Sequence, residues 1–290
     1  MLRLLPLLLL LLSCGERQPP ETASPETTPE TRIISLSGTL TELLYDLGYG
    51  DRIVGVDVTS AYPAAATELP KLGHVSQLNV EALLALRPDI VFVDKEAADQ
   101  PALQTLRDAQ VEVAAIPTQP TLDNALHATA ALDDYLEVPD QTLTELRQRI
   151  ERDSQALANT LAGTTDKPRV LFIYARGAGR LMVAGADTEA AAMIELAGGQ
   201  NAITSFTDFK PLTPEALVEA APDVLLLFTS GLASLDGKEG LANIPGIAQT
   251  PAYRNDRIVA MDGHYLLGFG PRAAAAANEL ATHLHPTISK

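Results

Sequence analysis

An internal repeat constrains the fold of this chain more than any other feature of its sequence. Residues 78–94 read LNVEALLALRPDIVFVD and residues 212–228 read LTPEALVEAAPDVLLLF, and the two segments align without a gap. Each combines an amphipathic helical pattern, a Pro-Asp pair that ends the helix, and an apolar run typical of a buried parallel strand. The repeat therefore predicts two related halves, each with a parallel sheet covered by helices.

The first half opens with residues 32–57, RIISLSGTLTELLYDLGYGDRIVGVD. This segment predicts a strand, a tight turn at Ser37 and Gly38, a helix, a glycine stop and a second strand. Thr39 is expected to cap the helix, and Glu42 stands three residues later, where it would complete a capping box. Both halves are expected to open alike, since RVLFIYARGAG begins the second half and is followed by a helix around Thr188–Ala197 that stops at Gly198 and Gly199.

Two helices are predicted between the halves, over residues 122–135 and 141–161. The second is long enough to span about 30 Å, the diameter of a small domain. Its apolar residues recur at helical spacing, and they are Leu143, Leu146, Ile150, Leu157 and Leu161. We therefore expect a rigid helical strut between two lobes.

The predicted fold class is α/β, with two Rossmann-like lobes whose central, mostly parallel sheets are joined by a long rigid helix. Ligands of open parallel sheets bind beyond the carboxyl ends of the strands, so the ligand cleft is expected between the lobes. The expected organisation is a signal peptide over 1–13, a lipidated cysteine with a disordered tether over 14–31, an N-lobe over 32–118, a helical connector over 119–167 and a C-lobe over 168–290.

The N-terminal segment MLRLLPLLLLLLSCGE has the basic start and short leucine run of a signal sequence. The motif LLSC resembles a bacterial lipobox, and Cys14 is the only cysteine of the chain. Residues 15–31 are dense in Pro, Glu and Thr and cannot bury enough apolar surface to fold. We expect a lipoprotein anchored through Cys14 on the periplasmic or extracytoplasmic face of a membrane. The alternative is a plain cleaved signal with an incidental cysteine.

The formal net charge is −16, which argues against two kinds of partner. A nucleic-acid-binding protein needs a basic face to neutralise phosphates, and docking on anionic lipid needs basic residues as well. Contact with a membrane is therefore expected only through the lipid anchor.

The repeat and the strut resemble the helix-linked class (class III) of bacterial periplasmic substrate-binding proteins of ABC importers, which carry vitamin B12, iron-siderophores or haem. The resemblance runs from about Arg32 to the end of the chain. It implies a monomer that delivers cargo to a permease dimer with its ATPase. In this class one glutamate per lobe docks on arginines of the permease, and Glu81 and Glu215 match these glutamates in the two repeats. Alternatively, each is a first-turn glutamate that complements the helix dipole.

Three segments look like the haem-binding branch of this class, and they read VDVTSAYPAAA (56–66), MVAGADTEAAAMIELAGGQNAI (182–203) and YLLGFGPR (265–272). In that branch the tyrosine of the first segment gives a phenolate to the haem iron, and here this residue is Tyr62. A phenolate is an established ligand of haem iron, although iron must displace a proton whose pKa is roughly 10 in free tyrosine. The alternative is a loop tyrosine whose ring packs under the N-lobe rim.

Haem also carries two propionates, which favour guanidinium partners. Arg176 and Arg180 follow a predicted strand and are candidates to meet them, or to lie beside the phenolate. Some relatives place a histidine in this region, but here Arg176 stands there, so we predict a single tyrosine ligand. Either arginine could instead be a solvated loop residue. Further candidates for the cleft are Ser37, Gly38, His74, His264 and Arg272. The remaining histidines are expected on the surface, and they are His127, His283 and His285.

Other functions were weighed against haem delivery. A vitamin B12 or siderophore binder of the same class would not need an axial phenolate. A chelatase-like enzyme would share the two-lobed fold, but the sequence has no Gly-rich phosphate loop, G-x-S-x-G elbow or H-E-x-x-H motif. A metal-ion receptor would gather several His, Asp and Glu ligands, and only two histidines are candidates to converge. We therefore expect a binding protein rather than an enzyme.

Overall fold

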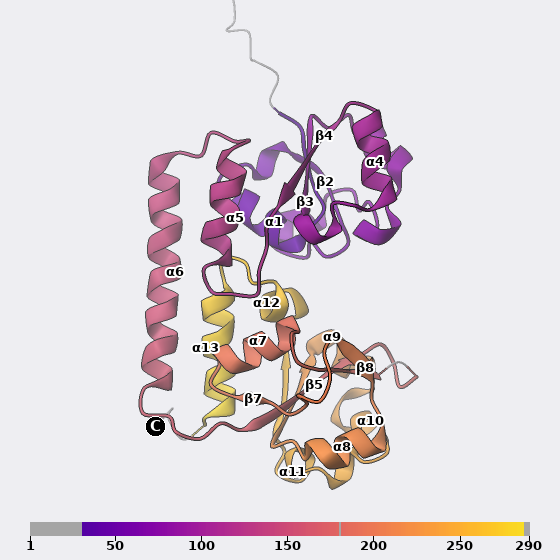
Figure 1. Ribbon diagram of the computed structural model, residues 1–290, viewed down its shortest axis with the longest axis vertical. Coiled ribbons are helices and arrows are strands. Elements are labelled where there is room, and N and C mark those ends of the chain that lie inside the picture. The colour runs from indigo at the N-terminus through magenta and orange to yellow at the C-terminus, as the bar shows by residue number, and fades with distance from the viewer. Residues whose placement is uncertain (1–30, 180, 287–290) are drawn as a thin grey trace, which may run out of the picture. The chain divides into compact units, whose positions relative to one another are not determined.

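The computed structural model describes residues 31–179 and 181–286 (Figure 1). The predicted signal peptide, Cys14, nearly all of the predicted tether and Arg180 lie outside the described residues. Within the described ranges, no helix has the length and apolar character needed to cross a membrane. The expectations for the N-terminal segment therefore stay predictions.

The N-lobe, as we call the part built on the first sheet, has four parallel strands in the order β2-β1-β3-β4. The strands are β1 (Ile33–Ser35), β2 (Ile53–Val56), β3 (Ile90–Asp94) and β4 (Glu112–Ile116). The helices of this lobe are α1 (Gly38–Asp46), α2 (Ala64–Thr67), α3 (Val80–Ala85) and α4 (Pro101–Asp108).

The C-lobe is built on a second, mixed sheet in the order β10-β9-β5-β6-β8, with β7 paired to β5. Its strands are β5 (Arg169–Ala175), β6 (Leu181–Ala184), β7 (Gln200–Asn201), β8 (Phe209–Pro211), β9 (Val224–Phe228) and β10 (Ile258–Met261). Its helices are α7 (Glu189–Leu196), α8 (Pro214–Ala220), α9 (Thr229–Ala233), α10 (Gly237–Ala242), α11 (Pro251–Arg254), α12 (Gly263–Leu267) and α13 (Ala273–Leu284). The predicted α/β class with mostly parallel sheets is confirmed.

The repeat forms the same unit twice, since α3 with β3 and α8 with β9 follow the predicted helix and strand. The prediction that both halves open alike is confirmed in part. The predicted helix of the second half is present as α7, and β7 after it pairs parallel with β5 as β2 pairs with β1, but the C-lobe inserts a strand between β5 and α7. β1 continues through α1 into the parallel strand β2, whereas β5 is followed by the antiparallel strand β6. A parallel crossover needs a dozen or more residues, and β6 begins at Leu181, only a few residues after β5 ends at Ala175.

The predicted capping box on α1 is also wrong. Ser37 is the N-cap, and its side chain accepts a hydrogen bond from the backbone N–H of Leu40. Thr39 Oγ1 instead donates to the carbonyl oxygen of Gly268, and the Glu42 carboxylate binds residues of the C-lobe. Tertiary partners therefore take both side chains that a local cap would have used.

Two helices connect the lobes, α5 (Asn124–Asp133) and α6 (Asp140–Leu161), close to the predicted ranges. In Figure 1, α6 runs beside both lobes, and it packs along α13. Leu146 and Ile150 enter the N-lobe core, and Leu157 enters the C-lobe core. One helix thus contributes to two hydrophobic cores.

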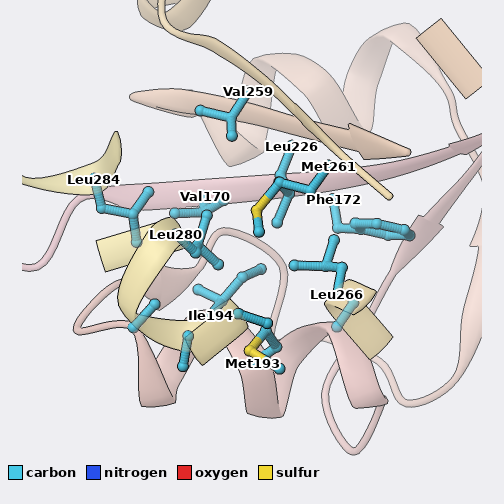
Figure 2. Packing of buried hydrophobic residues seen from close by; sticks show 14 of the residues in the cluster. Val170, Phe172, Met193, Ile194, Leu226, Val259, Met261, Leu266, Leu280 and Leu284 are labelled. Atoms are coloured by element: carbon cyan, nitrogen blue, oxygen red, sulfur yellow. The ribbon is translucent and has the colours of Figure 1, made fainter. Parts of the chain in front are cut away.

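Figure 2 shows the core between the C-lobe sheet and its helices. Phe172 of β5 and Leu226 of β9 are fully buried there, against Ile194 of α7 and Leu280 of α13. The histidine predictions hold for His127 and His283, which are exposed. The prediction is wrong for His285, which is only 6% exposed. Its ring lies at the end of α13 against Gly198, so the fold covers a residue that sequence position suggested was peripheral.

Candidate functional site

The loop after β2 carries Tyr62 and rests on a buried polar scaffold. Asp57 and Ser60 are 1% and 0% exposed. The Asp57 carboxylate accepts hydrogen bonds from Thr59 Oγ1 at 2.7 Å and from Ser60 Oγ at 2.8 Å. A buried carboxylate is stable when hydrogen bonds satisfy it, so this loop is folded around its own acceptor.

Hydroxyl groups beneath the loop extend the scaffold into the sheet and α1. Ser60 Oγ lies 2.8 Å from Thr41 Oγ1, which donates to Ser35 Oγ of β1. On the other side, Lys71 Nζ donates to the carbonyl oxygens of Ser60 and Ala66, at 2.8 and 2.9 Å. The backbone on both sides of Tyr62 is therefore held from two directions.

Tyr62 itself is 43% exposed. The guanidinium carbon of Arg272 lies 3.6 Å from the centroid of its ring, a close cation–π contact. Within residues 31–179 and 181–286, the Tyr62 hydroxyl makes no hydrogen bond. The phenol oxygen is thus available to a ligand, while the ring is held from the side by a cation.

Arg272 is held in turn by Glu42 of α1. Its Nε and a terminal nitrogen donate to the two carboxylate oxygens of Glu42, at 2.7 and 2.9 Å. His264 Nε2 lies 3.1 Å from Glu42 Oε2. Burial alone would raise the pKa of Glu42, but the hydrogen bonds from His264 and Arg272 lower it below its usual value. Glu42 is therefore a carboxylate that stays charged while only 3% exposed.

A cavity of about 840 Å³ opens beside this cluster, at the carboxyl ends of the strands of both lobes. Its walls include Ser37, Gly38 and Asp94 from the N-lobe and Tyr174, Arg176 and His264 from the C-lobe. The position agrees with the expected cleft between the lobes. A flat ligand of several hundred Å³ fits such a volume.

A second cavity of about 480 Å³ adjoins the first and shares Val58, Tyr174 and Arg176 with it. His74 and Met182 line this second space. Arg176 is exposed and its guanidinium carbon lies 5.4 Å from the Tyr174 ring. The exposed guanidinium of Arg176 therefore lies at the junction of the two cavities.

The other sequence candidates lie near the cavity but already have partners. The backbone N–H of Gly38 donates to Thr59 Oγ1 at 2.9 Å, and the side chain of Ser37 caps α1. His264 is occupied by Glu42, and its ring fills the space that a Cβ on Gly38 would need. His74 is exposed, with Nδ1 2.9 Å from Ser76 Oγ. Of these residues, His74 alone presents a ring that the protein packing leaves accessible.

Two acidic residues of the site were not expected from the sequence. Glu42 was placed in a local cap, and nothing in the local pattern signals its partners in the C-lobe. Asp94 lines the cavity, and burial, with the charge of Glu96 adding, raises its pKa to about 6. The position of Asp94 could have been predicted, because it is the last residue of its repeat and therefore lies at the carboxyl end of a parallel strand. The last residue of the other repeat, Phe228, lines the same cavity.

Glu81 and Glu215 occupy matching positions, in the first turns of α3 and α8, and both are exposed. The N-caps of these helices are Asn79 and Thr213. The helix dipole favours a carboxylate in the first turn of each helix. Both carboxylates are also exposed, so each is accessible to a partner. The described residues contain no cluster of His, Cys, Asp and Glu suited to a metal ion.

The sequence profile of the periplasmic binding protein family matches residues 33–265. The chain therefore belongs to this family, whose members bind substrates for transport. Its fold is also that of a solved relative. The periplasmic haem-binding protein RhuT from Roseiflexus sp. RS-1, in its apo form, is 38% identical, with a TM-score of 0.83, over 89% of this chain and 99% of RhuT.

Curated relatives are more distant and carry other descriptions. The vitamin B12-binding protein of Vibrio cholerae serotype O1 is 27% identical over 260 residues, which are 88% of this chain and 90% of that protein. YvrC of Bacillus subtilis, an ABC transporter substrate-binding lipoprotein, is 25% identical over 264 residues, which are 89% of this chain and 81% of YvrC. The protein is thus a member of the periplasmic binding protein family, and its relatives include proteins described as binding haem or vitamin B12.

Proposed function

We propose that this protein captures ferric haem in the cavity between its lobes, with the Tyr62 phenolate as the single axial ligand of the iron, and delivers it to an ABC importer. The observation that carries the proposal is the state of Tyr62. Its side chain is 43% exposed, its loop is held by a buried scaffold, and a guanidinium carbon lies 3.6 Å from its ring centroid. The phenolate of a tyrosine is an established ligand of haem iron.

Arg176 is proposed to meet a haem propionate. It is a cation at the junction of the two cavities, and no carboxylate of the described residues is paired with it. The porphyrin face needs apolar walls, and Phe228 and Leu267 with the ring of Tyr174 line the larger cavity. Arg180, which lies outside the described residues, stays a candidate for the second propionate.

The placement of the two candidate histidines, His74 and His264, favours single-ligand binding. His264 is engaged with Glu42, and His74 lines the adjoining cavity rather than the larger one. We therefore propose that the face of the iron away from Tyr62 meets no protein nitrogen from these two residues.

Delivery is proposed to use Glu81 and Glu215 as docking points for two basic pockets of a permease dimer. One exposed carboxylate on each lobe lets the transporter hold the lobes separately, and such charges act mainly on encounter and orientation. Cys14 is proposed to carry the lipid that keeps the protein near its transporter. A relative described as a lipoprotein supports this part of the proposal.

The test is a titration of the purified protein with ferric haem, followed by its visible spectrum, with Tyr62→Phe beside it. We expect the wild type to show a phenolate-to-iron charge-transfer band that Tyr62→Phe lacks. Affinity should fall by more than roughly 100-fold, since even changes behind a metal ligand cost 10- to 100-fold. Tyr135→Phe is the matched control, because Tyr135 is 44% exposed against 43% for Tyr62 and its ring packs on Phe92 rather than on Arg272. An unchanged spectrum in Tyr62→Phe would exclude Tyr62 as the ligand.

Vitamin B12 is the second candidate cargo, because the curated relatives include proteins described as vitamin B12-binding. Cobalamin brings its own axial ligands and no ferric centre that requires a phenolate. If cobalamin is the cargo, the wild type should bind it more tightly than haem, and Tyr62→Phe should change its affinity by less than about fivefold.

A further inference from the structure

Glu42 has an arrangement that its own lobe does not explain. It lies on α1 of the N-lobe and is 3% exposed, yet its hydrogen bonds run to Arg272 and His264 of the C-lobe. Burying an ionised carboxylate is unfavourable unless charged donors surround it. The burial of a charged Glu42 therefore calls for an explanation. If it only tied the lobes together, a neutral pair would do so at a lower desolvation cost.

The effect of Glu42 is visible in the plane of Arg272. Two parallel N–H···O bonds to one carboxylate fix a guanidinium in orientation as well as in position. The same guanidinium carbon lies 3.6 Å from the Tyr62 ring centroid and 5.1 Å from that of Tyr265. The plane that Glu42 fixes is therefore the surface against which Tyr62 rests.

Tyr62 depends on this contact more than a buried tyrosine would. Nearly half of its side chain is exposed, and its hydroxyl makes no hydrogen bond within the described part of the chain. The scaffold below the loop holds the backbone through Asp57 and Lys71, but it does not reach the ring. The direction of the phenol oxygen is thus set by Arg272, and through it by Glu42.

We infer that Glu42 is a positioning residue for the iron ligand: by holding Arg272 against the ring of Tyr62 it fixes the direction of the phenol oxygen and couples this direction to the seating of one lobe on the other. The inference rests on the proposed function, because it assumes that Tyr62 binds iron. It adds a residue from α1 that touches neither the haem nor the phenol.

The experiment compares Glu42→Gln, Arg272→Gln and the double variant in the purified full chain loaded with ferric haem. The readouts are the resonance Raman bands of the iron-bound phenolate and the rate of haem transfer to apomyoglobin. We expect Glu42→Gln to broaden or shift the phenolate bands and to speed haem loss roughly tenfold. The double variant should lose haem no faster than Arg272→Gln alone, because Glu42 acts through Arg272.

Asn124→Ala serves as the matched structural control. Asn124 is 1% exposed, and its side-chain amide donates to the carbonyl oxygen of Phe269, so it also ties the lobes without touching Arg272. We expect this variant to lower the free energy of unfolding while the phenolate bands keep their wild-type positions. If Glu42→Gln behaves like Asn124→Ala, the inference is overturned.

Arg272→Lys keeps the test decisive if Glu42→Gln does not fold. Lysine preserves the charge but cannot form the two-pronged contact, so we expect it to alter the phenolate bands as Arg272→Gln does. Wild-type bands in Arg272→Lys would show that only charge matters and would overturn the inference. The inference would also be overturned if the effects of Glu42→Gln and Arg272→Gln on the rate of haem loss were fully additive. A stronger phenolate band in Glu42→Gln would overturn it as well. A wild type without phenolate bands would overturn the proposed function itself, and with it this inference.

Discussion

The two lobes carry the same helix–strand repeat, but the last residue of the repeat is polar in one lobe and apolar in the other. In the N-lobe the repeat ends at Asp94, a carboxylate, whereas in the C-lobe it ends at Phe228, an aromatic ring, and both line the larger cavity. The N-lobe adds the hydroxyl groups of Ser37, Thr39 and Thr59 to this cavity, whereas the C-lobe adds Arg176 and the ring of Tyr174. A shared scaffold thus supports an oxygen-rich wall facing a cationic and aromatic wall.

The difference in topology explains this division. In the N-lobe, α1 lies between β1 and β2 and covers the lobe with a helix that offers Glu42 to the partner lobe. In the C-lobe, β5 is followed directly by the antiparallel β6, which leaves a short loop at the cavity mouth with Arg176 on it. A duplicated unit can therefore diverge by changing the connection after its first strand, while the repeat itself stays intact.

The N-lobe scaffold should give the largest effect. Asp57→Ala removes the acceptor of the hydroxyl groups of Thr59 and Ser60, of which Ser60 is fully buried, so we expect the free energy of unfolding to fall by about 3 kcal/mol. Haem affinity should fall roughly tenfold as well, because the Tyr62 loop loses its anchor. Chemical denaturation and haem titration measure the two effects. Asp51→Ala, at an exposed position of the same lobe, should change neither, and equal effects at both positions would contradict a scaffold role for Asp57.

The exposed glutamates test whether the lobes are equivalent toward the transporter. Glu81→Ala and Glu215→Ala should each lower haem uptake in reconstituted vesicles by roughly fivefold, and the pair by more, while haem affinity stays unchanged. Glu219→Ala, on the same exposed helix as Glu215, is the control. A strong effect from one lobe alone would show that docking is asymmetric despite the repeat.

The cationic wall of the C-lobe is tested at Arg176. Arg176→Gln should weaken haem binding roughly fivefold to tenfold, a loss of about 1 kcal/mol that reflects one exposed charge-assisted contact. Arg254→Gln, another exposed arginine of the C-lobe, should have no effect on the same titration. Because the contact is proposed to be ionic, the loss in Arg176→Gln should shrink at high salt. A loss that is independent of salt would contradict a propionate contact.

The carboxylate at the end of the N-lobe repeat should have a small, pH-dependent effect on stability. Burial, with the charge of Glu96 adding, raises the pKa of Asp94 from 3.8 to about 6. Between these values the folded protein keeps a proton that the unfolded chain releases, so stability falls as pH rises through this window. Asp94→Asn should therefore raise the free energy of unfolding by about 1 kcal/mol at pH 8 and leave it unchanged near pH 4, after allowance for partial exposure.

Asp99→Asn is the control for this measurement, because Asp99 is an exposed acid a few residues along the chain. Denaturation curves at several pH values compare the two variants with the wild type. A stability gain of Asp94→Asn that is equal at all pH values would contradict the proposed proton linkage.

Local sequence patterns predicted most of the helices and strands, because the spacing of apolar residues reflects which face of each element is buried. β2 and β10 begin and end where their apolar runs do, and α6 differs from its predicted range by one residue. The connection after β5 was predicted incorrectly, because residues 169–179 are as compatible with a hairpin as with a crossover. The strand that pairs back to form the hairpin, β6, begins beyond them.

The site was less predictable, because its main contacts join distant parts of the chain. Arg176, Ser37 and Gly38 could be placed at the cavity, since residues at the carboxyl ends of parallel strands share one edge. Glu42 could not be placed, because Arg272 is 230 residues away and the local pattern favoured a capping box instead. Sequence periodicity shows which face a residue occupies, but not which residue of another element meets it there.

The helix α6 also determines the angle at which one lobe faces the other, because its residues enter both cores at fixed positions along one helix. Leu146 and Ile150 are fixed in one core and Leu157 in the other. Each residue of an α-helix adds about 100° of rotation and about 1.5 Å of rise, so the number of residues between these contacts fixes how one lobe faces the other. One inserted residue would turn Leu157 out of its core, whereas seven would nearly restore the phase about 10 Å further along. The alignment of the oxygen-rich wall with the cationic wall is therefore encoded partly in a count of residues, at positions that touch neither wall.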